Sequence, residues 1–325
     1  MRVLIVRLSS LGDVVHAAPV LGDLHRAHPG AQVDWVVEEA FVPLARSLAG
    51  IERIVPFALR RWKKSLGAAW PEWTEFWRSL RSVRYDAVLD LQGLVKSALV
   101  TRAAVLAPGG RRYGLANRTD GAAYEPLARL AYDVALAMPP RIHVVDRSRE
   151  LAARALGYAV EGEPVVPWRP PPLDPQDARW ADPRDVLLVH GSAKLVKLLP
   201  TAFWSELGRR LVARGAQPLL AWGTADERLR AEAIQREIGG SSAVLPRLPL
   251  DRLAAVMLRM GGSIGLDTGL SHMAATLGRP TVQIFIEDKA WRAAAYWELR
   301  TAVVQASEVA LPTVEQVLQA WERVA

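Results

Sequence analysis

The sequence predicts an α/β protein with two doubly wound domains, each built around a parallel β-sheet. Short apolar stretches alternate with segments of helical length, a pattern typical of strands and helices that follow one another. The alternation stops at residues 164–183, which hold seven of the 22 prolines, and then restarts. A chain of 325 residues is long enough for about two domains.

The first domain opens with a buried strand, a loop and a helix. In chain order its predicted elements are a strand at 3–6, a loop at 9–13, a helix to about residue 26, strands at 32–37 and 87–91, and a helix from residue 95. Pro29 and Gly30 follow the first helix and end it. Strands that alternate with helices form a parallel sheet whose crossovers are right-handed. This pattern predicts a doubly wound domain.

The second domain repeats this pattern after the prolines. Its predicted elements are strands at 185–190, 218–222, 263–266 and 281–285, and helices at 200–214, 225–238, 268–277 and 313–324. Pro200 at a helix start and Gly215 just past its end support the first of these helices. We therefore expect domains at residues 1–165 and 166–311, with the last helix, about 312–325, packing back on the first domain.

Composition narrows the function. The chain carries 41 basic and 34 acidic residues, a net charge of +7, and only six of its basic residues are lysines. The arginines are dispersed along the chain, which favours a compositional bias over a nucleic-acid-binding patch. The absence of cysteine excludes disulfides and thiol chemistry. The sequence shows neither a long apolar span nor a signal peptide, so a cytoplasmic location is expected.

The first candidate site is S-S-L-G-D at 9–13, where a strand meets the start of a helix. Ser10 and Asp13 fit a capping box, in which the acidic side chain only supports the helix start. Alternatively, Asp13 is a general base. A carboxylate here would repel a phosphate and suits the deprotonation of a hydroxyl better.

The second candidate site is D-T-G-L-S-H at 267–272, again between a strand and a helix. Gly269 allows close approach of a ligand, and a helix N-terminus attracts an anion such as a diphosphate. The alternative is that Asp267 is an ordinary N-cap.

Two further features lie at the carboxyl ends of strands in the second domain. Lys194 and Lys197 follow the strand that ends at His190, and could neutralise a diphosphate or form a solvated pair. Glu227 follows Trp222-Gly223, and could accept ribose hydroxyls or complement a helix dipole.

A basic, tryptophan-rich segment follows in the first domain. It runs R-R-W-K-K at 60–64 and continues with Trp70, Trp73 and Trp77 on one helical face. It is either a membrane-interface or anionic-acceptor element, or a core stripe beside a solvated basic turn. The chain has no Asp-x-Asp pair, no H-E-x-x-H and no P-loop, so no metal or nucleotide-triphosphate motif is predicted.

Together these elements resemble the ADP-heptose:lipopolysaccharide heptosyltransferases, and in particular the heptosyltransferase I branch. Six stretches carry the resemblance in family order: M-R-V-L-I-V-R-L-S-S-L-G-D-V at the start, V-D-W-V-V-E-E-A-F at 33–41, I-E-R-I-V-P with R-R-W-K-K at 51–64, Y-D-A-V-L-D-L-Q-G-L-V-K-S-A at 85–98, R-E-L-A-A-R-A-L-G-Y at 149–158 and L-D-T-G-L-S-H-M-A-A at 266–275.

The resemblance implies a glycosyltransferase-B fold, two Rossmann-like domains facing across a cleft, and an inverting transfer of heptose from ADP-heptose to the Kdo sugar of lipid A. It implies no cofactor and no metal, ADP as product, contact with the cytoplasmic face of the inner membrane, and no nucleic acid. Asp13 would be the catalytic base. Donor-binding residues would be Ser192, Lys197, Glu227, Asp267, Thr268, Gly269 and His272. Acceptor-binding residues would be Ser9, Ser10, Gly12, Arg60, Arg61, Lys64, Gln92 and Lys96.

Two loops depart from the family pattern. The chain reads G-S-A-K-L-V-K-L-L-P at 191–200, where a hydroxyl-rich run and K-x-W-P are expected. It reads I-E-D-K-A-W-R at 286–292, where G-P-T-D-P is expected, and Tyr124 stands where an arginine is expected. An altered donor pocket is therefore expected. A related glycosyltransferase with another nucleotide sugar, a weakened family member and a non-catalytic binding protein are the alternatives.

Overall fold

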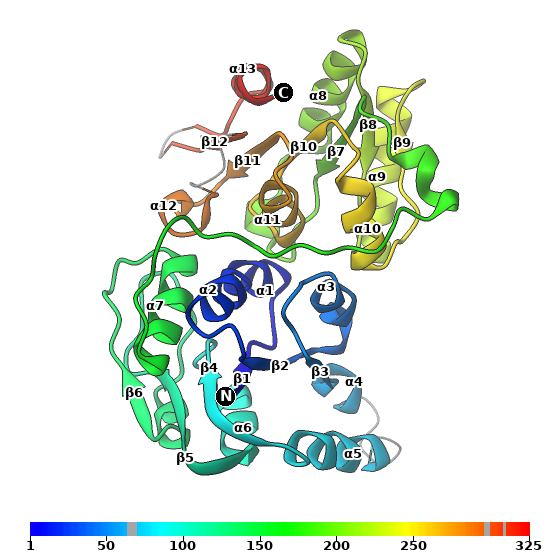
Figure 1. Cartoon of the computed structure of the whole chain (residues 1–325). Helices are drawn as coiled ribbons and strands as arrows, with labels where there is room; N and C mark the ends of the chain where they lie inside the picture. Colours follow the sequence, from blue (N-terminus) through cyan, green and yellow to red (C-terminus); the bar gives the residue numbers. More distant parts are fainter. Residues whose placement is uncertain (64–69, 296–299, 308–309) are drawn as a thin grey trace. The chain divides into compact units, whose positions relative to one another are not determined.

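The computed structural model describes residues 1–63, 70–295, 300–307 and 310–325, and divides into two compact units, Met1–Arg169 and Pro170–Ala325 (Figure 1). The division falls four residues after the expected boundary at 165. A bridge between Leu48 and Trp168 extends the first unit to this point, and the N–H of Ala49 donates to the carbonyl of Pro167 at 2.7 Å.

The described part of the first unit contains a six-stranded parallel sheet in the order β3-β2-β1-β4-β5-β6. Its strands are β1 (Arg2–Val6), β2 (Gln32–Glu38), β3 (Arg53–Phe57), β4 (Arg84–Asp90), β5 (Val105–Leu115) and β6 (Val134–Leu136). Its helices are α1 (Leu11–Ala17), α2 (Pro19–Ala27), α3 (Val42–Arg46), α4 (Leu59–Trp62), α5 (Trp70–Arg81), α6 (Val95–Ala103) and α7 (Val144–Leu156), with short 3₁₀ turns η1 (Glu39–Phe41) and η2 (Pro126–Ala131).

The described part of the second unit repeats this topology, in the order β12-β11-β10-β7-β8-β9. Its strands are β7 (Asp185–Val189), β8 (Gln217–Leu220), β9 (Ala243–Val244), β10 (Gly262–Leu266), β11 (Thr281–Phe285) and β12 (Thr301–Gln305). Its helices are α8 (Thr201–Ala213), α9 (Ala225–Ile238), α10 (Leu250–Met257), α11 (Gly269–Thr276), α12 (Ala290–Ala293) and α13 (Val314–Val324), with 3₁₀ turns η3 (Pro175–Trp180) and η4 (Leu195–Lys197). The predicted pair of doubly wound parallel sheets is therefore confirmed.

Each sheet reverses its winding direction at one pair of strands. In the first unit this pair is β1 and β4, and in the second it is β7 and β10. Chain segments leave these neighbouring strands in opposite directions, which opens a crevice at their carboxyl ends where ligands of such folds bind. The S-S-L-G-D and D-T-G-L-S-H motifs follow β1 and β10 directly. Both therefore lie at a topological switch point.

The helix predicted from the first loop to residue 26 is wrong in one respect: the chain forms two helices there. α1 ends at Ala17, Ala18 keeps a helical conformation, and α2 begins at Pro19. Proline lacks an N–H and cannot continue the hydrogen-bond ladder of the preceding turn, although it suits the first position of a new helix. Strands β3, β5 and β6 were not predicted from the sequence. Pro56 lies within β3, where it is tolerated because β3 is an edge strand.

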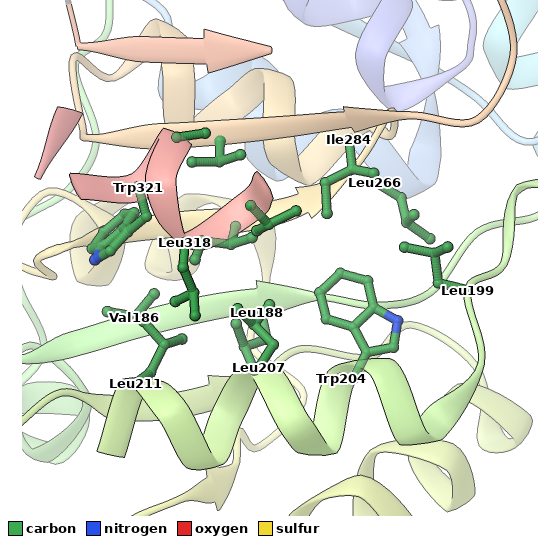
Figure 2. Close-up of a cluster of buried hydrophobic side chains, with 14 of the residues drawn as sticks. Val186, Leu188, Leu199, Trp204, Leu207, Leu211, Leu266, Ile284, Leu318 and Trp321 are labelled. Atoms are coloured by element: carbon green, nitrogen blue, oxygen red, sulfur yellow. The ribbon is translucent and has the colours of Figure 1, made fainter. Parts of the chain in front are cut away.

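The expectation that the last helix packs back on the first domain is wrong. Its apolar face belongs to the core of the second unit, where Leu318 and Trp321 join Val186, Leu188 and the α8 residue Leu211 (Figure 2). Trp204 of α8 is fully buried in the same cluster. Helix α13 thus covers the second sheet with its apolar face.

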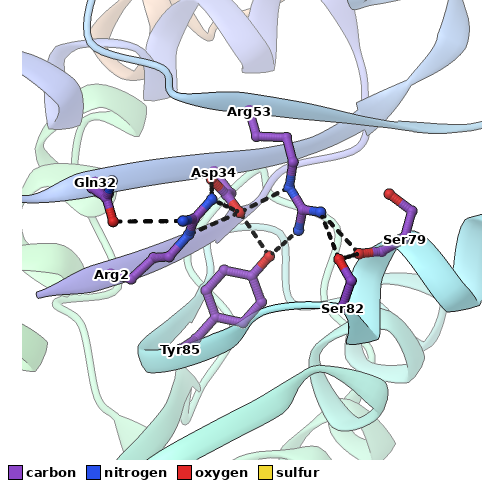
Figure 3. A network of polar contacts seen from close by, with 7 residues as sticks. All are labelled: Arg2, Gln32, Asp34, Arg53, Ser79, Ser82 and Tyr85. Carbon is purple, nitrogen blue, oxygen red and sulfur yellow. Dashed lines mark hydrogen bonds and ion pairs between the residues drawn. The ribbon is translucent and has the colours of Figure 1, made fainter.

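A buried charge network fixes the amino-terminal end of the first sheet (Figure 3). Asp34 of β2 is fully buried and pairs with Arg2 of β1 at 3.0 Å and with Arg53 of β3 at 3.0 Å. The hydroxyl of Tyr85, on β4, donates to the same carboxylate at 2.9 Å. Four neighbouring strands therefore share one buried anion, far along each strand from the carboxyl ends that carry the motifs.

Replacing Asp34 by alanine leaves two arginines and a tyrosine hydroxyl without their common acceptor. We expect Asp34→Ala to destabilise the first unit by about 3–5 kcal/mol, the range for a broken buried ion pair. Hydrogen–deuterium exchange of peptides from β1 to β4 measures this unit by itself. The matched control is Glu75→Ala, which removes an exposed ion pair with Arg78 and should leave exchange unchanged. Equal protection in both variants would contradict the role assigned to Asp34.

Candidate active site

Asp13 lies in the first turn of α1 and is held by the helix start itself. One carboxylate oxygen accepts hydrogen bonds from the backbone N–H of Ser10 at 2.9 Å and from its hydroxyl at 2.7 Å. The other oxygen pairs with the guanidinium of Arg7 at 2.5 Å. A carboxylate has about four acceptor positions, so one remains for an incoming hydroxyl. The capping interaction predicted from the sequence is present, and it orients the carboxylate without consuming it.

The surroundings of Asp13 keep it ionised. Burial raises its pKa, but the Arg7 guanidinium and the hydrogen bonds from Ser10 outweigh burial and hold the pKa of Asp13 well below its usual range. Arg7 is itself buried, and its second nitrogen donates to the carbonyl of Leu91 at 2.5 Å. Sequence reasoning did not identify Arg7 as a site residue. Its signal is a charged residue directly after a fully apolar strand.

Several predicted acceptor-side residues meet around this carboxylate. The ammonium of Lys96, at the start of α6, donates to the Ser9 hydroxyl at 2.9 Å. Burial lowers the pKa of Lys96, Arg60 and Arg7 lower it further, and Glu38 and Asp13 oppose the change. Gln92 is buried and accepts from the N–H of Leu8 at 2.9 Å, which ties the loop after β4 to the chain just after β1. Gly12 is buried within α1.

The basic residues of the segment at 60–64 differ in their contacts. The backbone N–H of Arg60 donates to Glu38, and its exposed side chain is near enough to Lys96 for its charge to lower the pKa of that lysine. Arg61 pairs with Glu39 at 2.9 Å and also with Glu72, so its charge is already balanced. The predicted residue Lys64 lies outside the described residues.

The packing of the tryptophans tests the alternative that this segment forms a core stripe. Trp62, Trp73 and Trp77 pack on one another and on Phe76 at centroid distances of 4.8–5.6 Å, as part of the core of the first unit. Trp70 is exposed. The core-stripe interpretation is therefore confirmed for Trp73 and Trp77 and wrong for Trp70.

In the second unit, Asp267 forms the centre of a charge cluster at the carboxyl end of β10. Its carboxylate pairs with the ammonium of Lys197 and accepts from Nε2 of His272 at 3.1 Å. Burial raises the pKa of Asp267, but His272 and Lys197 together hold it well below its usual range. The structure thus brings together three of the predicted donor-side residues.

Thr268 and Gly269 form the start of α11. Thr268, not Asp267, is the N-cap residue, so the N-cap interpretation of Asp267 is wrong. The first intrahelical bond runs from the N–H of His272 to the carbonyl of Thr268 at 3.1 Å. The N–H groups of residues 269–271 precede that bond and form the positive end of the helix dipole. The Thr268 hydroxyl oxygen is buried and has no hydrogen-bond partner among the described residues.

The loop that departs from the family pattern contributes two site residues that sequence reasoning missed. Glu287 pairs with Lys289 and lies 3.7 Å from the ammonium of Lys197. Lys289, Lys194 and Lys197 lower the pKa of Glu287 below its ordinary value. Three of the six lysines of the chain therefore surround two carboxylates. The rarity of lysine in this sequence is the signal that could have identified Lys289.

Ser192 and Glu227 lie at the neighbouring strand ends, after β7 and β8. Ser192 accepts from the N–H of Lys194 at 3.2 Å. Glu227 accepts from the N–H groups of Gly223 at 2.7 Å and Thr224 at 3.1 Å, so it forms a capping box in the first turn of α9, where the helix-dipole alternative also placed it. A Cβ at position 191 would lie 2.7 Å from a carboxylate oxygen of Glu227 and would displace that carboxylate, so Gly191 leaves room for it. The ribose-binding role of Glu227 stays a prediction.

Neither a metal-binding cluster nor a membrane-spanning helix is found among the described residues. Within the described residues, no group of three or more histidine, aspartate or glutamate side chains is arranged to hold a metal ion. No helix in the described part of the chain has the length and apolarity that a bilayer span requires.

Comparison with known proteins assigns this arrangement to a family. A profile of glycosyltransferase family 9 (heptosyltransferase) matches residues 73–320. Lipopolysaccharide heptosyltransferase 1 of Pseudomonas aeruginosa is 41% identical over 289 residues, which cover 88% of this chain and 78% of the relative. Lipopolysaccharide heptosyltransferase 1 of Escherichia coli K12 is 38% identical over 291 residues, 88% of each chain.

Solved structures give the same result. The E. coli heptosyltransferase WaaC with ADP superposes with a TM-score of 0.86 and 32% identity over the whole of both chains. WaaC with ADP-2-deoxy-2-fluoro heptose gives a TM-score of 0.81 at the same identity. The predicted glycosyltransferase-B fold is thereby confirmed.

The pair of Arg7 and Asp13 can be tested by titration. In Arg7→Gln the cation is lost while the burial that raises the pKa of Asp13 stays, so the pKa should rise toward the ordinary aspartate range, although Ser10 still donates to the carboxylate. The carboxyl ¹³C resonance of Asp13, followed against pH, measures the shift. Arg78→Gln removes an exposed cation of the same unit and should leave the Asp13 midpoint in place. An unmoved midpoint in Arg7→Gln would show that Arg7 does not control Asp13.

Proposed function

The chain belongs to glycosyltransferase family 9, the heptosyltransferase family, and we propose that it transfers heptose from ADP-heptose to the Kdo sugar of lipid A during assembly of the lipopolysaccharide inner core. One observation carries the proposal. Each unit places an ionised carboxylate with its own cation, Asp13 with Arg7 and Asp267 with Lys197, at a topological switch point. The first suits an acceptor hydroxyl and the second a nucleotide sugar.

The donor side of the proposal rests on the lysines and the start of α11. The diphosphate of ADP-heptose would lie at the N–H groups of residues 269–271 with the Thr268 hydroxyl, where a helix N-terminus favours an anion. Lys197 would exchange part of its contact with Asp267 for a phosphate oxygen. Asp267 would then accept hydrogen bonds from hydroxyls of the sugar, with Ser192 and Glu227 toward the nucleotide.

The acceptor side rests on Asp13. A Kdo hydroxyl would donate to the free acceptor position of the Asp13 carboxylate, and its oxygen would attack the anomeric carbon of the heptose from the face opposite ADP. The anomeric C–O bond to the diphosphate breaks, its electron pair stays on ADP, and the hydroxyl proton passes to Asp13. The low pKa of Asp13 suffices because the hydroxyl becomes strongly acidic as its new bond forms. Attack from the opposite face inverts the configuration.

We propose that this reaction needs neither a metal nor a cofactor. Charge on the departing ADP would be stabilised by Lys197, Lys194 and Lys289 together with the α11 amides, a preorganised arrangement that acts where charge develops. The exposed side chains of Arg60 and Lys63 would face the anionic acceptor. Its lipid part implies contact with the cytoplasmic face of the inner membrane, where anionic lipids attract basic segments.

A second donor is favoured by one observation. Glu287 and Lys289 come from the loop that departs from the family pattern, and both join the cluster around Lys197. A changed set of charges beside the sugar could select another nucleotide sugar.

The central prediction concerns turnover by the Asp13→Asn variant. The amide keeps an oxygen for the N–H of Ser10 but cannot take a proton, so turnover of ADP-heptose with heptose-free Kdo-lipid A should fall by about 10²–10⁴-fold. ADP affinity, measured by calorimetry, should stay unchanged. Asp226→Asn, an exposed first-turn aspartate of α9, is the matched control and should keep full turnover. Wild-type turnover in Asp13→Asn would remove Asp13 from the chemistry.

Donor choice has a separate test. With Kdo-lipid A as acceptor, we expect kcat/KM for ADP-heptose to exceed that for other ADP-, UDP- and GDP-sugars, as read from the mass of the product. Faster transfer of a different sugar would assign the chain to the second donor.

Metal independence is tested with a chelator. Turnover after dialysis against EDTA should equal turnover before it, because lysines and helix amides supply the positive charge. A loss of turnover that Mg²⁺ or Mn²⁺ restores would contradict this part of the proposal.

A further inference from the structure

Gln283 is a buried polar residue in the middle of β11. It is fully inaccessible to solvent and pairs in parallel register with Gly265 of β10 and Val303 of β12. A buried amide is costly unless its donor and acceptor atoms both find partners. Both partners of Gln283 are present, and one of them is His272 of the donor-side cluster.

The partners fix which way the Gln283 amide points. The backbone N–H of Ala295 can only donate, and it lies 2.9 Å from Oε1 of Gln283. The amide nitrogen therefore faces Nδ1 of His272, at 2.9 Å. An amide nitrogen can only donate, so Nδ1 must be the unprotonated, accepting nitrogen of the ring.

This assignment determines the rest of the chain of contacts. With Nδ1 unprotonated, the single ring proton lies on Nε2, which donates to Asp267 at 3.1 Å. Lys197 pairs with the other carboxylate oxygen of Asp267. The alternative tautomer would set a lone pair against the carboxylate, and a doubly protonated ring would set two N–H groups against each other at Gln283.

We propose that Gln283 is a positioning residue, which selects the Nε2-protonated tautomer of His272 and thereby orients Asp267 toward the donor. The kinetic part rests on the proposed function, since it requires Asp267 to contact the sugar nucleotide. The same contact at Ala295 ties the chain segment after α12 to the cluster. Gln283 acts on the donor only through His272.

The first test reads the tautomer directly. In the full chain labelled with ¹⁵N-histidine at pH 8, the ring nitrogens of His272, assigned by their loss in His272→Gln, should show Nδ1 unprotonated and Nε2 protonated. In Gln283→Glu the carboxylate accepts from Nδ1–H, so that nitrogen should become protonated. In Gln283→Leu only the Asp267 carboxylate still favours a proton on Nε2, so the preference should weaken and protonation of Nδ1 should become detectable.

The second test is kinetic. Gln283→Leu should raise KM for ADP-heptose about tenfold, the effect of one lost buried hydrogen bond, with a smaller change in kcat. The matched control is Ser263→Ala on the adjacent β10. Ser263 is also buried, and its hydroxyl has no hydrogen-bond partner among the described residues, so neither readout should change.

Two results would overturn the proposal: a wild-type His272 protonated on Nδ1, or an unchanged tautomer in both Gln283 variants. Should Gln283→Leu fail to fold, Gln283→Glu still decides the matter, because it keeps an acceptor for the N–H of Ala295. The ring-nitrogen readout needs no turnover. A wild-type protein that transfers no heptose would therefore end the proposed function and leave the tautomer assignment standing.

Discussion

The strand order of the two parallel sheets is the constraint on which the rest of the molecule depends. Because winding reverses at β1 and β4 and again at β7 and β10, each sheet exposes loop backbone and a helix start at one place on its carboxyl edge. Asp13 and Asp267 occupy these two places. The opposite, amino-terminal edge of the first sheet carries Asp34, whose three partners come from three strands and serve cohesion only. Chemistry and stability are thus assigned to opposite ends of the same strands.

Arginine and lysine also occur in different places: arginine in ion pairs between elements, and lysine at the candidate sites. Ion pairs that link elements through a buried aspartate use arginine: Arg149 with Asp23, Arg53 with Asp34, Arg252 with Asp177. A planar guanidinium binds a carboxylate through several fixed donors and suits a permanent contact. Lysine is scarce, and Lys96, Lys194, Lys197 and Lys289 all lie at the candidate sites. The two residue types therefore serve different kinds of contact.

The sequence predicts the parallel sheets and the switch-point motifs because both depend on local pattern. Helix 225–238 and strand 281–285 have the predicted limits. A threonine cap with Glu227 marks the helix start, and the strand follows Pro280 and is rich in β-branched and aromatic residues. The destination of α13 could not be predicted, because an amphipathic helix does not encode which sheet it covers. Arg7, Gln283, Glu287 and Lys289 were missed as site residues for a related reason. Their roles arise from contacts across the sheet or between loops. The sequence marks Arg7 and Lys289 as unusual, but it does not show which groups they contact.

Structural and functional interpretations of one carboxylate are not exclusive here. Asp13 takes part in the capping of α1 and Asp267 is anchored by His272, yet each contact also fixes where the remaining acceptor positions point. The two cations differ in a way that matters. Arg7 is buried and bonded to Leu91 as well as Asp13, so it stays in place. Lys197 has a flexible stem and two carboxylates within reach, so a phosphate can replace one of them without leaving the ammonium unpaired. If the two sites act as proposed, the acceptor side would have a fixed counter-ion, whereas the donor side would have one that exchanges partners.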